Sequence, residues 1–109
     1  MERIIEDVVE TYNEIKEDGE MVTYGEDRTP MKDMGITSLK DLYRYGIRTY
    51  GKCVSKIFED GEKGKTIHTG YVFESREKYQ DCDKTYIRHV WLSIEKYREI
   101  IQRERIPIQ

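Results

Sequence analysis

Residues 70–97, GYVFESREKYQDCDKTYIRHVWLSIEKY, form the most regularly patterned stretch of the sequence. Aromatic and β-branched residues alternate with charged ones on both sides of an acidic segment. This is the two-residue period of a β-strand, in which successive side chains point to opposite faces. The pattern predicts one strand over 66–75 (TIHTGYVFES) and another over 85–92 (TYIRHVWL), joined by the connection REKYQDCDK.

The same period extends toward the N-terminus from this stretch. Residues 52–58 (KCVSKIF) alternate in the same way, and the polar loop EDGEKGK with its two glycines separates them from the strand at 66–75. Such a loop is typical of a hairpin. We therefore expect three antiparallel strands in a meander, with helices packed on the sheet.

Three helices are expected around this sheet. Residues 2–17 carry apolar side chains at the spacing of one helical face: Ile4, Ile5, Val8, Val9, Tyr12 and Ile15. A shorter helix is expected over 38–45, capped by Thr37 or Ser38 and stopped by Gly46. A final helix is expected over 94–105 after Ser93, with an inward face of Ile94, Tyr97, Ile100 and Ile101.

The remaining segment, 20–37, is the least regular. MVTY (21–24) fits a short strand, and GEDRTPMKDMG fits a loop because Pro30 disfavours helix just before it. Together these elements predict an α+β fold: a three-stranded antiparallel meander with an N-terminal helix, a short second helix and a C-terminal helix packed on it. The length of 109 residues fits a single domain over 1–109.

Composition narrows the class of protein. Charged residues make up 38% of the chain, against roughly 25% in an average globular protein, yet the net charge is only −3. There is no alanine, and Asn13 is the only asparagine, a usage that resembles heat-tolerant proteins. No basic segment followed by an apolar run opens the chain, and no run approaches 18 apolar residues. A cytoplasmic protein that spans no membrane is expected.

Apolar side chains fall on both faces of the expected sheet. Tyr71 shares a face with Phe73 in one strand, whereas the strand at 85–92 does not divide into a polar and an apolar side. If Tyr71 lies opposite Tyr86, then Trp91 and His89 lie on the second face. A register shifted by one residue instead places Trp91 in the core. The chain's own helices, a second copy, or another molecule must cover the remaining face.

The expected function follows from that second face. We expect a non-enzymatic interaction module that binds a protein partner or itself, without a cofactor, through an aromatic-containing sheet surface. Trp and Tyr concentrate binding energy because they bury much area at low entropic cost. The candidate binding residues are Trp91, Tyr86, His89 and Tyr71.

The alternative is a nucleic-acid-binding protein. The pattern of residues 31–48 is similar to that of a helix-turn-helix. In such a motif Lys40, Arg44 and Arg48 would contact phosphates. The strand aromatics also have the chemistry for stacking bases. The net negative charge and the absence of any Lys/Arg run longer than two residues disfavour both versions.

A metal- or ligand-dependent regulator is the third interpretation, and its signals are weak. His68 and His89 can face each other across the second hairpin, but no metal-ligand spacing accompanies them. Cys82 lies between two aspartates, which disfavour its thiolate, and Cys53 is expected to be buried in a strand. No catalytic and no metal-binding residue is assigned.

Overall fold

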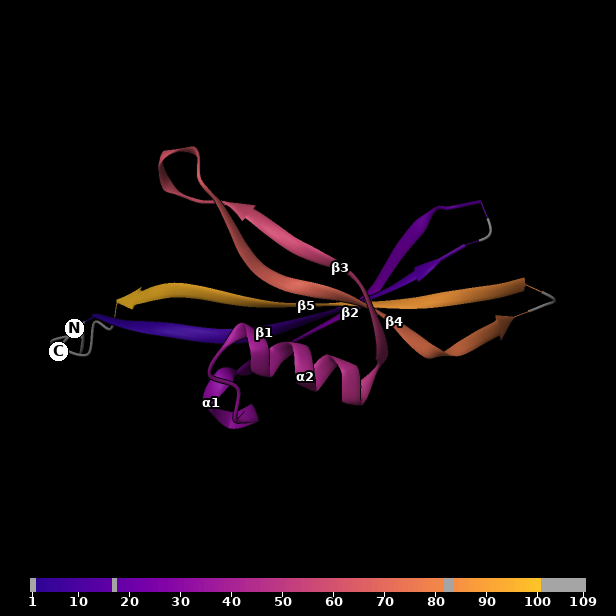
Figure 1. Cartoon of the computed structure of the whole chain (residues 1–109), viewed down its shortest axis with the longest axis horizontal. Helices are drawn as coiled ribbons and strands as arrows, with labels where there is room; N and C mark the ends of the chain where they lie inside the picture. Colours follow the sequence, from indigo (N-terminus) through magenta and orange to yellow (C-terminus); the bar gives the residue numbers. More distant parts are fainter. Residues whose placement is uncertain (1, 17, 82–83, 101–109) are drawn as a thin grey trace, which may run out of the picture.

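The computed structural model describes residues 2–16, 18–81 and 84–100, and these ranges contain a five-stranded antiparallel sheet (Figure 1). The strands lie in the order β2-β1-β5-β4-β3, and the molecule is elongated, with principal extents of 63 × 36 × 29 Å. Their bounds are β1 Glu2–Ile15, β2 Met21–Pro30, β3 Gly51–Asp60, β4 Thr66–Asp81 and β5 Lys84–Ile100. β1 and β5 form the centre of the sheet.

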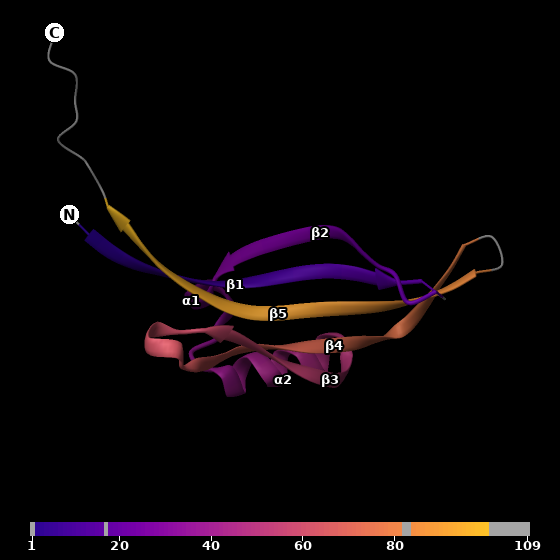
Figure 2. The same cartoon turned by 90° about the horizontal axis from the view of Figure 1, so that it is seen from above.

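Two helices connect β2 to β3, and a single 3₁₀ turn, η1 (Glu62–Gly64), joins β3 to β4. The helices are α1, Met31–Met34, and α2, Leu39–Thr49, and both lie on the same face of the sheet (Figures 1 and 2). The buried core fills the space between that face and the helices. Its members are Val8, Met31, Ile36, Leu42, Phe73, Val90 and Leu92.

The predicted N-terminal helix is wrong: residues 2–15 form β1, which pairs with β2 on one side and β5 on the other. The pairs Ile4-Ile5 and Val8-Val9, four residues apart, mimic a helical stripe. In the strand each pair places one side chain on each face of the sheet, so both faces receive apolar groups. β-branched residues favour strands, and pairing on both sides overrides the helical spacing.

The predicted C-terminal helix is also wrong, because β5 continues without a break to Ile100. Ser93 caps no helix and instead lies opposite Val9 and Gly70 within the sheet. Ile94 and Tyr97 point to opposite faces, as their odd spacing requires in a strand. Residues 101–105 of the predicted helix lie outside the described residues.

The middle of the chain is closer to expectation. The predicted short strand at 21–24 extends through the expected loop to Pro30 as β2. The second helix is confirmed, and Ser38 is its N-cap, where the Oγ accepts a hydrogen bond from the Asp41 amide at 3.2 Å. Gly46, however, does not stop it; α2 continues to Thr49.

The predicted fold class, three strands with three helices, is therefore corrected to five strands with two short helices on one face. The three expected strands are present and adjacent, with β4 between β3 and β5. Tyr71 lies opposite Leu92. In this register Phe73, Val90 and Leu92 lie on the face beneath the helices and are buried there. Trp91, between Val90 and Leu92 in the strand, lies on the opposite face.

Candidate functional site

The sheet face turned away from α1 and α2 carries the chain's single tryptophan. Trp91 lies on β5, opposite Thr11 of β1 and Val72 of β4. Its position an odd number of residues from the buried Val90 and Leu92 directs it to the other face. Neither helix within the described ranges packs on that face (Figure 2).

A shallow depression of about 390 Å³ surrounds Trp91. Trp91 is 37% exposed and Phe58 55% exposed, while Val72 at the base is 8% exposed. We call this region the Trp91 surface and define it by its lining residues: Ile15, Met21, Ser55, Lys56, Ile57, Phe58, Val72, His89 and Trp91. It draws side chains from all five strands, so the whole sheet positions it.

The four sequence-predicted binding residues are not all brought together. Trp91 and His89 share the Trp91 surface. Tyr71 lies on the helix side, where its ring packs edge-on against Tyr43 of α2 at 5.2 Å between centroids. The backbone of Tyr86 lies opposite Tyr79, and its side chain lies outside the described residues.

Asn13, a polar residue beside the Trp91 surface, is hydrogen-bonded within the chain. Asn13 lies opposite His89 and is only 1% exposed. Its Oδ1 accepts a hydrogen bond from the hydroxyl of Thr23 at 2.5 Å, and its amide donates to the Thr11 carbonyl at 3.5 Å. A buried amide held in this way fixes the pairing of β1 with β2. Because the sequence pattern predicts a helix over 2–17, it does not indicate this role for Asn13.

Charged groups at the other end of the same face are also paired within the chain. Arg28 Nη2 lies 2.9 Å from Glu95 Oε2, and Arg3 Nε lies 2.8 Å from Glu99 Oε2. Residues from this end also line a wider hollow, of about 820 Å³, next to α1. This part of the molecule carries no large excess of either charge.

The helix side holds a cluster that the sequence interpretation missed. Glu10 of β1 is 6% exposed, its carboxylate accepts hydrogen bonds from two tyrosines, and a third tyrosine hydroxyl lies nearby. Tyr45 donates at 3.3 Å to Oε1, Tyr50 donates to Oε2, and Tyr12 lies 3.5 Å from Oε2. Tyr12 also donates to Asp27 at 2.9 Å. A buried carboxylate needs such donors, since an isolated charge is costly to bury.

The pKa values of the phenol groups in this cluster are raised, which disfavours a role in acid–base catalysis at neutral pH. Burial, followed by the hydrogen bond to Asp27, raises the pKa of Tyr12 from 10.0 to about 12. Burial raises the pKa of Tyr50 further, with the bond to Glu10 the next cause, and burial also raises that of Tyr45. The three hydroxyls stay protonated and donate, so the cluster ties α2 to β1.

Alkaline pH should weaken this tie. Because the folded pKa of Tyr50 lies above its unfolded value near 10, its stabilising contribution is full below pH 10 and falls as pH rises further. Replacing Tyr50 with phenylalanine should cost about 1.5–3 kcal/mol at pH 7. The difference from the wild type should narrow between pH 10 and 12. Urea denaturation followed by circular dichroism at several pH values measures it.

The control for that experiment is Tyr43→Phe, because Tyr43 is 40% exposed and its hydroxyl is outside the Glu10 cluster. Its stability difference from the wild type should stay small and constant with pH. A Tyr50→Phe difference that is equally constant from pH 7 to 12 would contradict the role given to the cluster.

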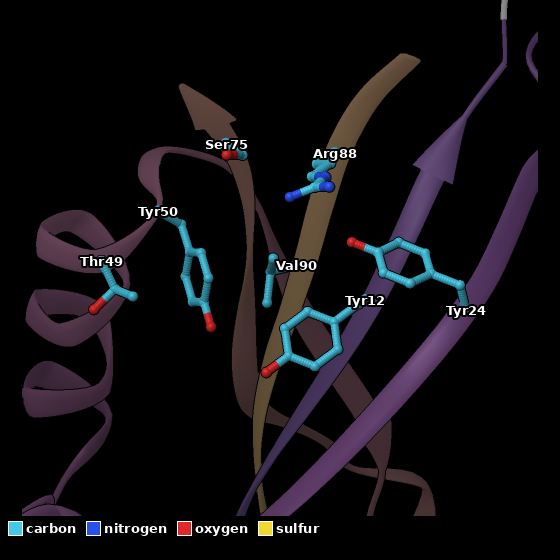
Figure 3. Close-up of a pocket in the computed structure, with 7 residues that line it drawn as sticks. All are labelled: Tyr12, Tyr24, Thr49, Tyr50, Ser75, Arg88 and Val90. Atoms are coloured by element: carbon cyan, nitrogen blue, oxygen red, sulfur yellow. The ribbon is translucent and has the colours of Figure 1, made fainter. Parts of the chain in front are cut away.

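A cavity of about 350 Å³ lies next to this cluster, between the C-terminal end of α2 and the sheet (Figure 3). Three tyrosines, an arginine and two small hydroxyl side chains surround it: Tyr12, Tyr24, Tyr50, Arg88, Thr49 and Ser75, with Val90 completing the wall. Figure 3 shows the guanidinium of Arg88 reaching from β5 toward the space between Tyr50 and Tyr24. Polar and aromatic groups therefore converge on one small hollow.

The alternative nucleic-acid residues lie together on α2. Lys40, Arg44 and Arg48 are exposed and recur every four residues, so they line one side of the helix. The opposite side packs on the sheet through Leu42 and Gly46. α1 spans only four residues and is too short to be the first helix of a helix-turn-helix.

The histidines and cysteines weighed as metal or thiol candidates are not brought together among the described residues. His89 lies opposite Glu74, whereas His68 lies opposite Phe58 of β3, so the histidines do not face each other. No group of three potential metal ligands occurs within the described ranges. Cys53 is free and half-buried rather than fully buried, and Cys82 lies outside the described residues.

Comparisons with known proteins give no relative: no family model, no curated protein and no solved structure matches the chain. Among the described residues, no helix has the length and apolar character needed to cross a bilayer. Any assignment of function therefore rests on the geometry of the two regions above.

Proposed function

We propose that this protein is a non-enzymatic binding module that assembles through the Trp91 surface, with a second copy of the chain as its partner. One observation carries the proposal: the only tryptophan is 37% exposed in a depression on the sheet face opposite both helices. A large aromatic group in such a place is typical of an interface anchor.

Covering this surface removes a large apolar area from water and so contributes favourable free energy of association. Trp91, Phe58 and Met21 retain 37%, 55% and 46% of their accessible surface, respectively. Removing apolar area from water contributes about 25 cal/mol per Å², and tryptophan has one of the largest areas to bury. Val72, which is 8% exposed, and Ile57, which is half-buried, form the base of the depression.

A second copy fits this surface for two reasons. Sheets of similar twist pack face to face about 10 Å apart, and two identical sheets have the same twist. In addition, the charges of Arg28 and Arg3, at the other end of the same face, are paired with glutamates of the same chain. Two copies therefore meet without strong repulsion, and a symmetric dimer is the simplest closed arrangement.

Trp91→Ala tests the proposal. Truncating an interface anchor costs about 2 kcal/mol or more, so the dimer dissociation constant should rise about 30-fold. Sedimentation equilibrium of both proteins over a range of concentrations measures this constant. Because Trp91 is partly exposed, the variant monomer should remain folded, which circular dichroism checks.

Tyr43→Ala is the matched control, since Tyr43 is a similarly exposed aromatic, at 40%, but lies on α2 on the helix side. It should leave the dissociation constant unchanged. A wild-type chain that stays monomeric at every concentration, or a Trp91→Ala monomer that is unfolded, would contradict the proposal.

The basic side of α2 supports a second candidate, binding of nucleic acid. Three exposed cations on one side of α2, at Lys40, Arg44 and Arg48, are of the kind that contact phosphates. Binding to mixed DNA or RNA that weakens steeply with salt, and that is lost on replacing these three residues with glutamine, would favour this candidate. The Trp91→Ala variant would then bind as the wild type does.

A further inference from the structure

We propose that the cavity beside the Glu10 cluster binds a small planar anion, an aromatic ring that carries one carboxylate or phosphate group. The site lies on the helix side of the sheet, away from the Trp91 surface, so it does not depend on the proposed self-association. Its wall combines aromatic rings, a guanidinium and hydroxyl groups, with side chains from α2 and from β1, β2, β4 and β5.

The dimensions suit one substituted ring. The volume of about 350 Å³ lies at the lower end of the range for small-molecule sites. Tyr12 and Tyr24 have ring centroids 6.1 Å apart with planes inclined by 34°, and Tyr50 faces them from the end of α2 (Figure 3). Val90, 3% exposed, lies on the sheet side. The flat ring faces of this wall favour a planar ligand over a branched aliphatic one.

The polar groups favour an anion. Arg88 reaches into the cavity, and a guanidinium matches a carboxylate or phosphate with two parallel hydrogen bonds. The side chains of Thr49 and Ser75 line the same space and add polar groups to its wall.

Three acidic residues lie close to the site, and two of them are screened from it. Glu10 accepts hydrogen bonds from Tyr45 and Tyr50, and Asp27 accepts one from Tyr12, so phenol groups stand between these carboxylates and the cavity. Glu14 lies opposite Arg88 in the strand register. Arg88 has five N–H donors, enough to serve both a strand neighbour and a bound anion.

Titration calorimetry with four simple probes tests the proposal: benzoate, phenyl phosphate, benzamide and benzylamine. The two anions should bind at least about tenfold more tightly than neutral benzamide, and benzylamine should bind least, because Arg88 repels a cation. The better of the two anions identifies the charged group. Equal affinities for benzoate and benzamide, or tighter binding of benzylamine, would overturn the proposal.

Variants locate the binding. Arg88→Gln should weaken binding of the preferred anion about tenfold or more. Tyr24→Leu removes an aromatic ring from the wall and should weaken binding of both the anion and benzamide. Tyr24 is 50% exposed, so its replacement leaves the core intact even if Arg88→Gln disturbs folding. Lys40→Gln, a cation removed from α2 outside the cavity, is the control and should bind as the wild type does. Unchanged anion binding in both cavity variants would place the ligand elsewhere.

Discussion

Phe73→Ala is expected to lower the free energy of unfolding by about 3–5 kcal/mol. Phe73 is fully buried on β4, and its ring lies about 6 Å between centroids from the rings of Tyr43 and Tyr71. It also fills the space under Gly46 of α2. Because a domain of this size is stable by only about 5–15 kcal/mol, this loss removes much of the total.

Urea denaturation measures the effect, and the chain's other phenylalanine supplies the control. Phe58 is 55% exposed, so Phe58→Ala should cost under about 1 kcal/mol when both changes are made in the Trp91→Ala background. That background weakens self-association and so reduces its contribution to the measured stability. If Phe73→Ala and Phe58→Ala cost the same, the helix-covered core is not where the structure places it.

Gly46→Ala is expected to lower the free energy of unfolding by a net amount of about 1–3 kcal/mol. Helix propensity alone predicts the opposite, since alanine is favoured over glycine in a helix interior by about 1 kcal/mol. Here a Cβ at position 46 would lie 2.1 Å from the Cζ of Phe73, so the ring or the helix must move.

A double-mutant cycle identifies the cause of that loss. Phe73→Leu shortens the side chain that meets residue 46, so Gly46→Ala should cost less in the Phe73→Leu protein than in the wild type. Lys40→Ala, at an exposed position of α2, should change stability by less than about 0.5 kcal/mol. A stabilising Gly46→Ala, or equal costs in the two backgrounds, would contradict the packing of α2 on β4.

The sequence predicted the elements whose signals are local. Alternation in β3, β4 and the first half of β5 is visible in the chain, and Ser38 caps α2 through a contact three residues away. β1 and the second half of β5 were missed because their paired apolar residues imitate a helix, and their strand state depends on each other. Gly46 likewise marks a close approach to Phe73 rather than a helix end.

The candidate site divides in the same way. That Trp91 and His89 share a face follows from their spacing in a strand. That Tyr71 lies on the opposite face from Trp91 and His89 follows only from its pairing with Leu92. The Glu10 cluster required β1 to be a strand, which places Glu10 and Tyr12 on one face, and required α2 to bring Tyr45 and Tyr50 over it. No local sequence pattern predicts either of these two conditions.

The fluorescence of the single tryptophan tests the central claim most directly, because it reports on Trp91 alone. On dilution through the dimer dissociation constant, the emission of Trp91 should shift to longer wavelength, and iodide quenching should increase at the same concentrations where the mass halves. Emission and quenching that do not change with concentration, in a protein whose mass does change, would show that the copies meet elsewhere and would contradict the account.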